Sequence, residues 1–198
     1  MDATHVGAFD IPLISNIPNL VYLSPTCKEE FVSMLEYSYN EKEHPIIIRV
    51  PSDDLLIKNM EDKTDYRKLN NYKVEHNGSN IAILAVGDFY RLGMSLKDAL
   101  KEKLNIDATF INPVYLTGLD TKLLEKLKDD HKIIVTLENG VLAGGFGEKI
   151  ASYYGNSNMK VLNYGGKKEF TDRKKLNDIY KENHLTVPQM IEDIKKLI

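Results

Sequence analysis

The residues with the clearest capacity for chemistry lie at the start of the chain, around His5. Asp2 precedes this histidine by three residues and Asp10 follows it by five, among small residues that leave room for a ligand. An imidazole close to a carboxylate can transfer a proton or bind a hydroxyl group. A surface histidine without a function is more common, so the spacing alone leaves both interpretations open. Chain ends usually fray. A site-like segment at the N-terminus therefore leads us to expect that this chain is the C-terminal part of a larger protein.

A second candidate is the glycine-rich segment 144–147, which precedes a predicted helix. Glycines at such a place let backbone N–H groups approach a phosphate group. The spacing is not that of a Walker A loop, no Ser or Thr follows Lys149, and the third glycine of the dinucleotide-binding fingerprint is missing. Glu138 lies just upstream and would repel an anion. We therefore interpret the segment as a structural turn that packs a helix closely against a sheet.

Arg49 and Cys27 occupy two further positions where chemistry is possible. Arg49 ends a predicted strand, a common place for an anion-binding arginine in α/β proteins, and a structural ion pair explains it equally well. Cys27 falls in the first turn of a predicted helix, where the pKa of a thiol can be lowered, but we favour simple packing. The other histidines fall at element ends or in a predicted connection, are expected to be solvated and lack metal-ligand spacing: His44, His76, His131 and His184.

The elements that would position these residues begin with a short unit of strand, helix and strand. The apolar segment 19–23 and the β-branched segment 46–50 predict strands. Between them we expect a helix that begins at Pro25, with Ser24 as its N-cap, and ends near Asn40. Its expected inward face consists of Cys27, Phe31, Met34, Leu35 and Ser38. Two strands and one helix cannot bury both faces of their sheet, so this unit needs a neighbour.

The segment 52–78 has no clear hydrophobic period and is too long for an ordinary loop, so we interpret it as a connection between domains. After it, strands and helices alternate at the spacing of an α/β domain with a largely parallel sheet. The expected strands are 81–86, 108–111, 133–137 and 160–164. The expected helices are 95–104, one capped by Asp120, one from the glycine-rich turn to near Tyr154, 174–182, and 187–198 with a capping box of Thr186 and Gln189.

The composition is that of an ordinary globular protein of 198 residues, with 42% hydrophobic and 28% charged residues. The net charge of −3 gives no basic excess for binding nucleic acid. No apolar run is long enough to span a bilayer, and the sequence pattern of a secretory signal is not present. A single cysteine excludes an intrachain disulfide and fits a reducing compartment, so we expect a cytoplasmic protein with neither a nucleic acid nor a membrane as partner.

Several of these segments together resemble the transketolase family, and in particular its deoxyxylulose-phosphate synthase branch. The two longest matching blocks are THVGAFD at 4–10 and LENGVLAGGFG at 137–147. Shorter blocks are IPN at 17–19, SPT at 24–26, IRVP at 48–51 and VLNYG at 161–165. The resemblance covers essentially the whole chain. It implies an α/β fold with the C-terminal part of a pyrimidine-binding domain (1–51), a linker (52–78) and a three-layer transketolase C-terminal domain (79–198).

The resemblance also implies a function for the residues around His5. Enzymes of this family use thiamine diphosphate and Mg²⁺, and the synthase branch joins a two-carbon unit from pyruvate to glyceraldehyde 3-phosphate. His5 would be a catalytic residue of the substrate channel, and Asp2 and Arg49 would bind substrate, although Asp2 stands one residue nearer to His5 than the family's aspartate. Ser52 stands where the family commonly has a second, phosphate-binding arginine. One neutral hydrogen bond there would replace a bidentate charged contact, which leaves a different acceptor substrate open.

The family's Gly-Asp-Gly motif, which holds the metal and the diphosphate, has no counterpart in this sequence. The resemblance places that motif, and the glutamate that activates the cofactor, upstream of this chain. We therefore expect no cofactor or metal on this chain alone, a missing N-terminal portion or subunit as its partner, and a homodimer as the assembly. A split transketolase, a 2-oxoacid dehydrogenase β subunit and a non-catalytic α/β assembly module stay open as alternatives.

Overall fold

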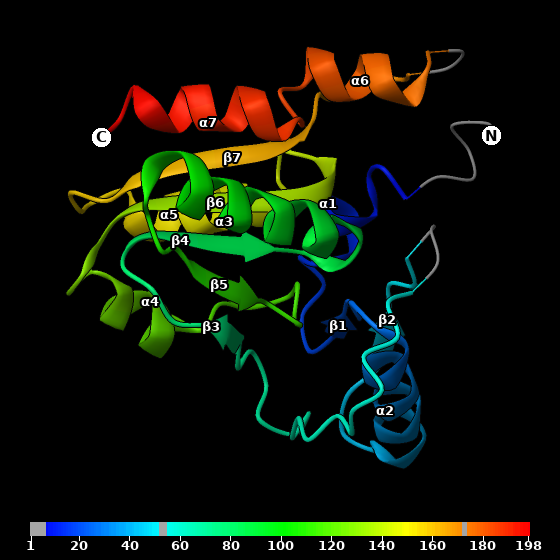
Figure 1. The fold of residues 1–198 in the computed structure, drawn as a ribbon. Helices are drawn as coiled ribbons and strands as arrows, with labels where there is room; N and C mark the ends of the chain where they lie inside the picture. Colours follow the sequence, from blue (N-terminus) through cyan, green and yellow to red (C-terminus); the bar gives the residue numbers. More distant parts are fainter. Residues whose placement is uncertain (1–6, 52–54, 172–173) are drawn as a thin grey trace.

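The computed structural model describes residues 7–51, 55–171 and 174–198, and Figure 1 shows how they fold. The helices are α1 (Asp10–Ile14), α2 (Lys28–Asn40), α3 (Tyr90–Leu104), α4 (Thr121–Leu127), α5 (Phe146–Tyr154), α6 (Leu176–Glu182) and α7 (Val187–Lys195), with a short 3₁₀ turn, η2 (Gly87–Phe89). The strands are β1 (Val21–Leu23), β2 (Ile46–Ile48), β3 (Lys73–His76), β4 (Asn80–Ala85), β5 (Thr109–Asn112), β6 (His131–Val141) and β7 (Lys160–Gly166).

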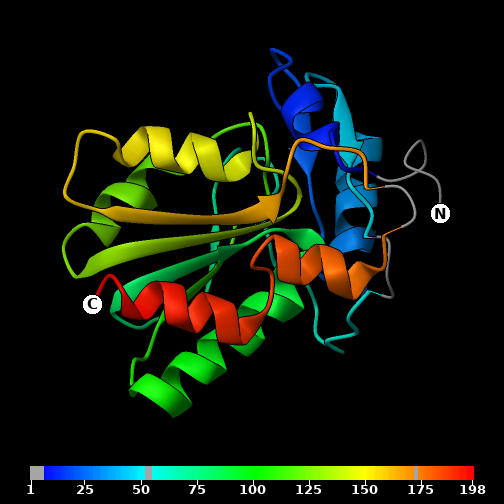
Figure 2. The ribbon, with the colours of Figure 1, turned by 90° about the horizontal axis from the view of Figure 1, so that it is seen from above.

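The larger sheet has five strands in the order β3-β5-β4-β6-β7. All neighbouring pairs are parallel except β3 and β5. The sequence of β4 fits this parallel arrangement. Its last five residues are all apolar and buried, as expected for a parallel strand that helices cover on both faces. Figure 2 shows α5 on one face of this sheet and α3 with α7 on the other. The predicted three-layer α/β architecture is therefore confirmed.

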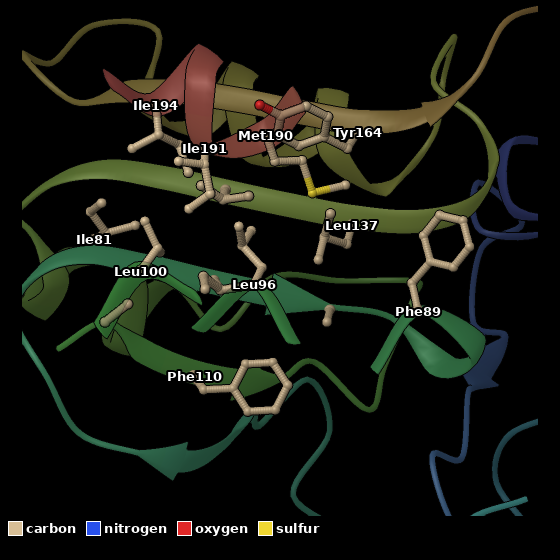
Figure 3. Close-up of a cluster of buried hydrophobic side chains, with 14 of the residues drawn as sticks. Ile81, Phe89, Leu96, Leu100, Phe110, Leu137, Tyr164, Met190, Ile191 and Ile194 are labelled. Carbon is tan, nitrogen blue, oxygen red and sulfur yellow. The ribbon is translucent and has the colours of Figure 1, made fainter. Parts of the chain in front are cut away.

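Each face of the sheet has its own hydrophobic core. Leu96 and Leu100 of α3 pack with Met190, Ile191 and Ile194 of α7 in the first core (Figure 3). The second core contains side chains of α4 and α5, among them Leu124, Phe146 and Ile150. Burying one such side chain stabilises the fold by about 1.5–3 kcal/mol. The two helical layers are thus fixed to the sheet independently of each other.

The predicted unit of strand, helix and strand is present, with β1 and β2 paired in parallel and joined by α2. Met34 of α2 covers one face of this small sheet. From the other face, Tyr22 enters the second core of the larger sheet. The free edge of β1 is hydrogen-bonded as well, since Leu116 N–H donates to Tyr22 O at 2.8 Å. The neighbour that this unit needs is therefore provided in part by the larger α/β unit.

Helix α2 begins three residues later than the sequence predicts. Its N-cap is Cys27 rather than Ser24. Thr26 explains the difference. Its N–H and its hydroxyl both donate to Glu30 Oε2 at 2.9 Å, and these two bonds keep the chain non-helical up to Cys27, which is extended. The predicted inward face is also wrong in part, because Leu35 is 46% exposed.

The segment 52–78 contains more structure than the sequence predicts. Its residues Lys73–His76 form β3, which pairs antiparallel with β5, and Tyr66 and Tyr72 are buried. Lys73 Nζ also lies 2.7 Å from the buried Glu30 Oε1, so the segment is tied to α2. The interpretation of these residues as a connection without a strand is wrong. The division of the chain at 1–51, 52–78 and 79–198 stays a prediction.

Two predicted helix caps have different outcomes. Asp120 accepts a hydrogen bond from Leu123 N–H at 3.0 Å, so its predicted role as the cap of α4 is confirmed. The predicted capping box of α7 is wrong, because the Thr186 hydroxyl donates to Gln189 Oε1 at 2.6 Å instead of receiving the helix N–H. Within the described ranges, no helix has the length and apolar character needed to cross a membrane.

Candidate functional site

The topology marks one place where an α/β sheet of this kind usually binds a ligand. The chain leaves β4 toward α3 on one face and leaves β6 toward α5 on the other face. Because β4 and β6 are neighbours, the crevice at their carboxyl ends is a topological switch point, where ligands of open α/β sheets bind. This edge of the sheet is the first place to look for a site.

The N-terminal residues of the chain itself fill this place. Ile11 of α1 is fully buried in the second core. Val141 N–H, at the end of β6, donates to Ala8 O at 2.8 Å, and Gly140 lies so close that a Cβ there would contact Ile11 Cδ1 at 3.4 Å. The predicted site residues His5 and Asp2 lie outside the described residues. The described part of their loop begins at Gly7 and lies against the carboxyl end of β6.

Arg49 holds this loop in place. Its Nε donates to Asp10 Oδ2 at 2.7 Å, and its Nη2 donates to Gly7 O at 3.0 Å and to Asn139 O at 2.6 Å. The Arg49 side chain is only 8% exposed. Burial alone would lower its pKa, but the Asp10 carboxylate more than offsets this effect and the pKa is raised. Of the two interpretations of Arg49, the structure contains the ion pair; its predicted contact with substrate stays a prediction.

Tyr22 completes the environment of Asp10. Its hydroxyl donates to Asp10 Oδ2 at 2.9 Å, the same oxygen that accepts from Arg49 Nε. Burial, followed by the charge of Asp10, raises the pKa of the Tyr22 hydroxyl, so it stays protonated and acts as a donor. Asp10 therefore joins β1, the end of β2 and the start of α1 through one carboxylate. The sequence does not reveal this cluster, because Arg49 and Asp10 are 39 residues apart.

The glycine-rich turn before α5 holds a carboxylate of the protein itself. Glu138 is fully buried, and its two oxygens accept hydrogen bonds from Phe146 N–H and Gly147 N–H, each at 2.8 Å. A Cβ on Gly145 would lie 2.5 Å from Glu138 Oε2. The prediction of a structural turn is confirmed. The expected role of Glu138 is corrected, because it occupies the anion-binding position of the helix rather than standing beside it.

The Glu138 carboxyl group has an unusual pKa for an acidic residue. Burial raises the pKa to about 7, although the two hydrogen bonds from Gly147 and Phe146 and the nearby Arg49 oppose the increase. The group therefore changes its charge near neutral pH at the carboxyl end of β6. The next residue in the chain, Asn139, accepts a hydrogen bond from Arg49 through its backbone oxygen. Glu138 is therefore one residue away from a contact of Arg49, the residue that fixes the N-terminal loop.

A cavity of about 280 Å³ opens at the same edge of the molecule. Its lining includes Pro51 after β2, Thr26 after β1 and Asp88 after β4. Asn139 Nδ2 donates to Asp88 Oδ2 at 2.6 Å, so one wall of the cavity is connected to the Arg49 cluster. Ser52, the residue at which the chain departs from the family pattern, follows Pro51 and lies outside the described residues.

The described residues do not fit a thiamine diphosphate–Mg²⁺ site. No group of three or more His, Cys, Asp and Glu side chains in the part of the chain that the structure describes could hold a metal ion. The N-terminus of α5, where a diphosphate could bind, is filled by Glu138. We therefore derive no reaction step through this cofactor from these residues.

The remaining candidates are structural. Cys27 is buried, and its burial raises the pKa of the thiol, which agrees with packing rather than with an activated nucleophile. His131 was expected to be solvated, but it is buried and its Nε2 lies 2.8 Å from Thr109 Oγ1. His76 and His184 face Asp107 and Asp193 at 3.0 and 2.9 Å, respectively.

Comparison with known proteins assigns the chain to a family. The family model of the transketolase C-terminal domain matches residues 70–190. This match covers more than half of the chain, and the chain therefore belongs to the transketolase C-terminal domain family. The resemblance predicted from the sequence blocks is confirmed.

Curated relatives narrow the similarity to one branch. The chain is 34% identical over 197 residues to the 1-deoxy-D-xylulose-5-phosphate synthase of Clostridium tetani. The aligned region covers 98% of this chain and 31% of that synthase. It is 31% identical over 200 residues to the synthase of Alkaliphilus oremlandii, again covering 98% of the chain and 31% of the relative. The chain thus spans about a third of the length of these relatives and corresponds to their C-terminal portion.

Solved structures agree with the fold. A split-gene transketolase, solved as an inactive β4 tetramer, superposes with a TM-score of 0.80 at 19% identity and covers 98% of this chain and 63% of that one. A transketolase from Pichia stipitis superposes with a TM-score of 0.69 at 16% identity and covers 98% of this chain and 27% of that one. At these identities the two structures support the architecture alone.

Proposed function

We propose that this chain is the C-terminal portion of a thiamine-diphosphate-dependent 1-deoxy-D-xylulose-5-phosphate synthase. The whole enzyme would convert pyruvate and glyceraldehyde 3-phosphate into 1-deoxy-D-xylulose 5-phosphate and CO₂ in the cytoplasm, for isoprenoid and thiamine biosynthesis. The observation that carries the proposal is the 34% identity to the Clostridium tetani synthase along 98% of the chain. The order and type of the chemistry-bearing residues, from His5 to Arg49, support it.

In this proposal the chain supplies half of the active site. His5 handles substrate oxygens, and Asp2 and Arg49 contribute to substrate binding. Arg49 has a second task, because its bonds to Gly7 O and Asp10 fix the backbone two residues after His5. The imidazole would then enter the substrate channel from a segment that Arg49 fixes on its C-terminal side.

The other half of the site comes from the portion that precedes this chain in the relatives. That portion would supply the Mg²⁺ ligands, the diphosphate-binding residues and the activating glutamate. Accordingly, the isolated chain would neither bind thiamine diphosphate tightly nor catalyse the reaction.

A second candidate is a separately encoded subunit of a split transketolase. The similarity to a solved protein described as a split-gene transketolase favours it. In that case the chain would act in ketol transfer between phosphosugars, with its N-terminal half on another polypeptide. Ser52 in place of the second arginine does not separate the two candidates, because the acceptor carries a phosphate in both reactions.

Reconstitution tests the proposal. The chain is co-expressed with the N-terminal two-thirds of the Clostridium tetani synthase, and product formation is measured with pyruvate plus glyceraldehyde 3-phosphate. A second assay offers a phosphosugar donor in place of pyruvate. Release of CO₂ with formation of deoxyxylulose 5-phosphate, lost in His5→Ala, is the expected result. Ketol transfer without pyruvate decarboxylation would favour the split transketolase. A stable complex with neither activity would contradict both candidates.

A further inference from the structure

Phe170 is an exposed aromatic residue in an otherwise polar segment. It lies in the connection between β7 and α6, and it is the only apolar residue of the sequence 167–175. Phe170 is 76% exposed, and none of the described residues in the range 167–182 is buried. Packing of the hydrophobic core therefore does not explain a phenylalanine at this position.

The ring of Phe170 contacts a ring of the N-terminal segment. Its centroid lies 5.6 Å from that of Phe9, and the two ring planes are at an angle of 62°. This is the edge-to-face arrangement that aromatic pairs prefer. In Figure 2 the connection that follows β7 passes beside the N-terminal segment before it reaches α6. The contact thus joins the first described residues to the connection that precedes the last two helices.

Phe9 belongs to a segment that already has polar attachments. It is the N-cap residue of α1. The residues on either side of it accept hydrogen bonds, Ala8 O from Val141 N–H at 2.8 Å and Asp10 Oδ2 from Arg49 Nε at 2.7 Å. These bonds attach the segment 7–10 to β6 and to the end of β2, and neither uses the Phe9 side chain. The ring contact is therefore a separate, apolar attachment of the same segment, made from the connection between β7 and α6.

The strength of such a contact suits a local role. An edge-to-face aromatic pair changes an equilibrium by a factor between about two and ten. Local opening of a loop costs much less free energy than global unfolding. A factor of this size therefore changes how often the segment 7–10 detaches from the sheet, and it leaves the folded fraction of the whole domain practically unchanged.

We propose that Phe170 is a positioning residue of the active site, on which it acts through Phe9. The inference rests on the proposed function, in which His5, four residues before Phe9, handles substrate oxygens. By holding the ring of Phe9, the connection between β7 and α6 keeps the segment 7–10 on the sheet and restricts the positions open to His5. The C-terminal part of the chain thus helps to arrange the site without contacting substrate.

Hydrogen exchange of the full chain, followed by NMR, tests the ring contact. The amide of Val141 reports the attachment of the segment, because it donates to Ala8 O. Phe170→Ala is expected to speed its exchange about two- to tenfold, whereas Phe170→Tyr keeps the ring and is expected to match the wild type. The amide of Val21, which is equally buried and donates to Pro45 O in the small sheet, should exchange at the same rate in every variant.

Two further variants verify that the pair itself is responsible. Leu176→Ala is the matched control, since Leu176 begins α6 and is 61% exposed, and it should leave the exchange of Val141 unchanged. In a Phe9→Ala background, Phe170→Ala should have no further effect, because the pair is already lost. Unchanged exchange in Phe170→Ala, or an undiminished effect of Phe170→Ala in the Phe9→Ala background, would overturn the proposal.

Kinetics of the reconstituted synthase test the positioning role. With pyruvate and glyceraldehyde 3-phosphate, kcat/KM is expected to fall about two- to tenfold in Phe170→Ala. It should keep the wild-type value in Phe170→Tyr and Leu176→Ala, and the urea midpoint should be the same in all three variants. Faster exchange with an unchanged kcat/KM would overturn the positioning role. A complex without synthase activity would contradict the proposed function and this role with it, while the exchange rates would still show whether the ring contact holds the segment.

Discussion

Arg49 donates from Nε to Asp10 Oδ2 across 2.7 Å, and this pair joins the end of β2 to the start of α1. The same guanidinium reaches Asn139 O at the end of β6. One buried side chain thus connects the small sheet, the N-terminal loop and the five-stranded sheet. The place where an α/β domain would bind a ligand is used here to hold a loop, and the site residues would be carried on that loop.

Replacing Arg49 tests this connection. Arg49→Met leaves the Asp10 carboxylate partly buried without its cation, and we expect the free energy of unfolding to fall by about 3 kcal/mol. Urea denaturation measures the change. Arg67→Met is the control, because Arg67 is 81% exposed in its pair with Asp65 and solvent screens such a pair. Equal small effects of both substitutions would contradict the role of Arg49.

The second prediction concerns the pH dependence caused by Glu138. Its pKa is raised from 4.5 to about 7 in the folded protein, so between these values the folded protein binds a proton that the unfolded chain has released. The stability that this proton on Glu138 contributes is therefore fully present below pH 4.5. It is lost as the pH rises through about 7, so the free energy of unfolding falls over this range. The full shift corresponds to about 3 kcal/mol.

Comparison of variants isolates this effect. The stability difference between wild type and Glu138→Gln is measured by denaturation from acidic to neutral pH, and it should change in favour of the variant as the pH rises. Glu102→Gln, at an exposed position of α3, is measured alongside as the matched substitution. A difference for Glu138→Gln that is constant with pH would show that the buried carboxyl group keeps an ordinary pKa.

The third prediction uses the close contacts of the turn before α5. A Cβ on Gly145 would lie 2.5 Å from Glu138 Oε2 and 2.7 Å from Val141 O, so Gly145→Ala must displace backbone or the buried carboxylate. We expect a loss of about 1–3 kcal/mol in thermal or urea unfolding. At Gly155 the nearest atom would be 3.4 Å away, and Gly155→Ala should be neutral or slightly stabilising. The reverse order of the two variants would contradict the packing described for the turn.

The fourth prediction concerns the bond between α2 and β3. Lys73 Nζ lies 2.7 Å from Glu30 Oε1, and Glu30 is only 1% exposed. Lys73→Met would leave that carboxylate buried without a cation, and we expect a loss of about 3 kcal/mol. Lys97→Met is the control, because its partner Asp98 is 70% exposed. If Lys73→Met is as mild as the control, the segment 55–76 is held by its buried tyrosines rather than by this ion pair.

The sequence predicts the central strands well, and the reason is physical. Strand β4 is a continuous apolar run, which is typical of a parallel strand between two helical layers. Strand β3 escapes prediction because it is a four-residue edge strand, KVEH, whose pairing with β5 depends on tertiary structure. The start of α2 is misplaced for a similar reason, since the bonds from Thr26 to Glu30 compete with the expected cap.

The candidate site is less predictable than the fold. The blocks around His5 and Glu138 are visible in the sequence, but the bond from Arg49 to Asp10 joins residues 39 positions apart and depends on the packing of both sheets. The role of Glu138 is likewise determined by its burial against the α5 N-terminus. Periodicity reports which residues are inside, and it does not report which polar groups meet there.

The most direct test of the central claim, that this chain holds only half of an active site, is calorimetric titration of the isolated chain with thiamine diphosphate and excess Mg²⁺. We predict a dissociation constant above about 1 mM, equivalent to less than about 4 kcal/mol of binding free energy. The same titration of the chain reconstituted with its N-terminal portion should give tight binding. Micromolar affinity for the isolated chain would contradict the claim.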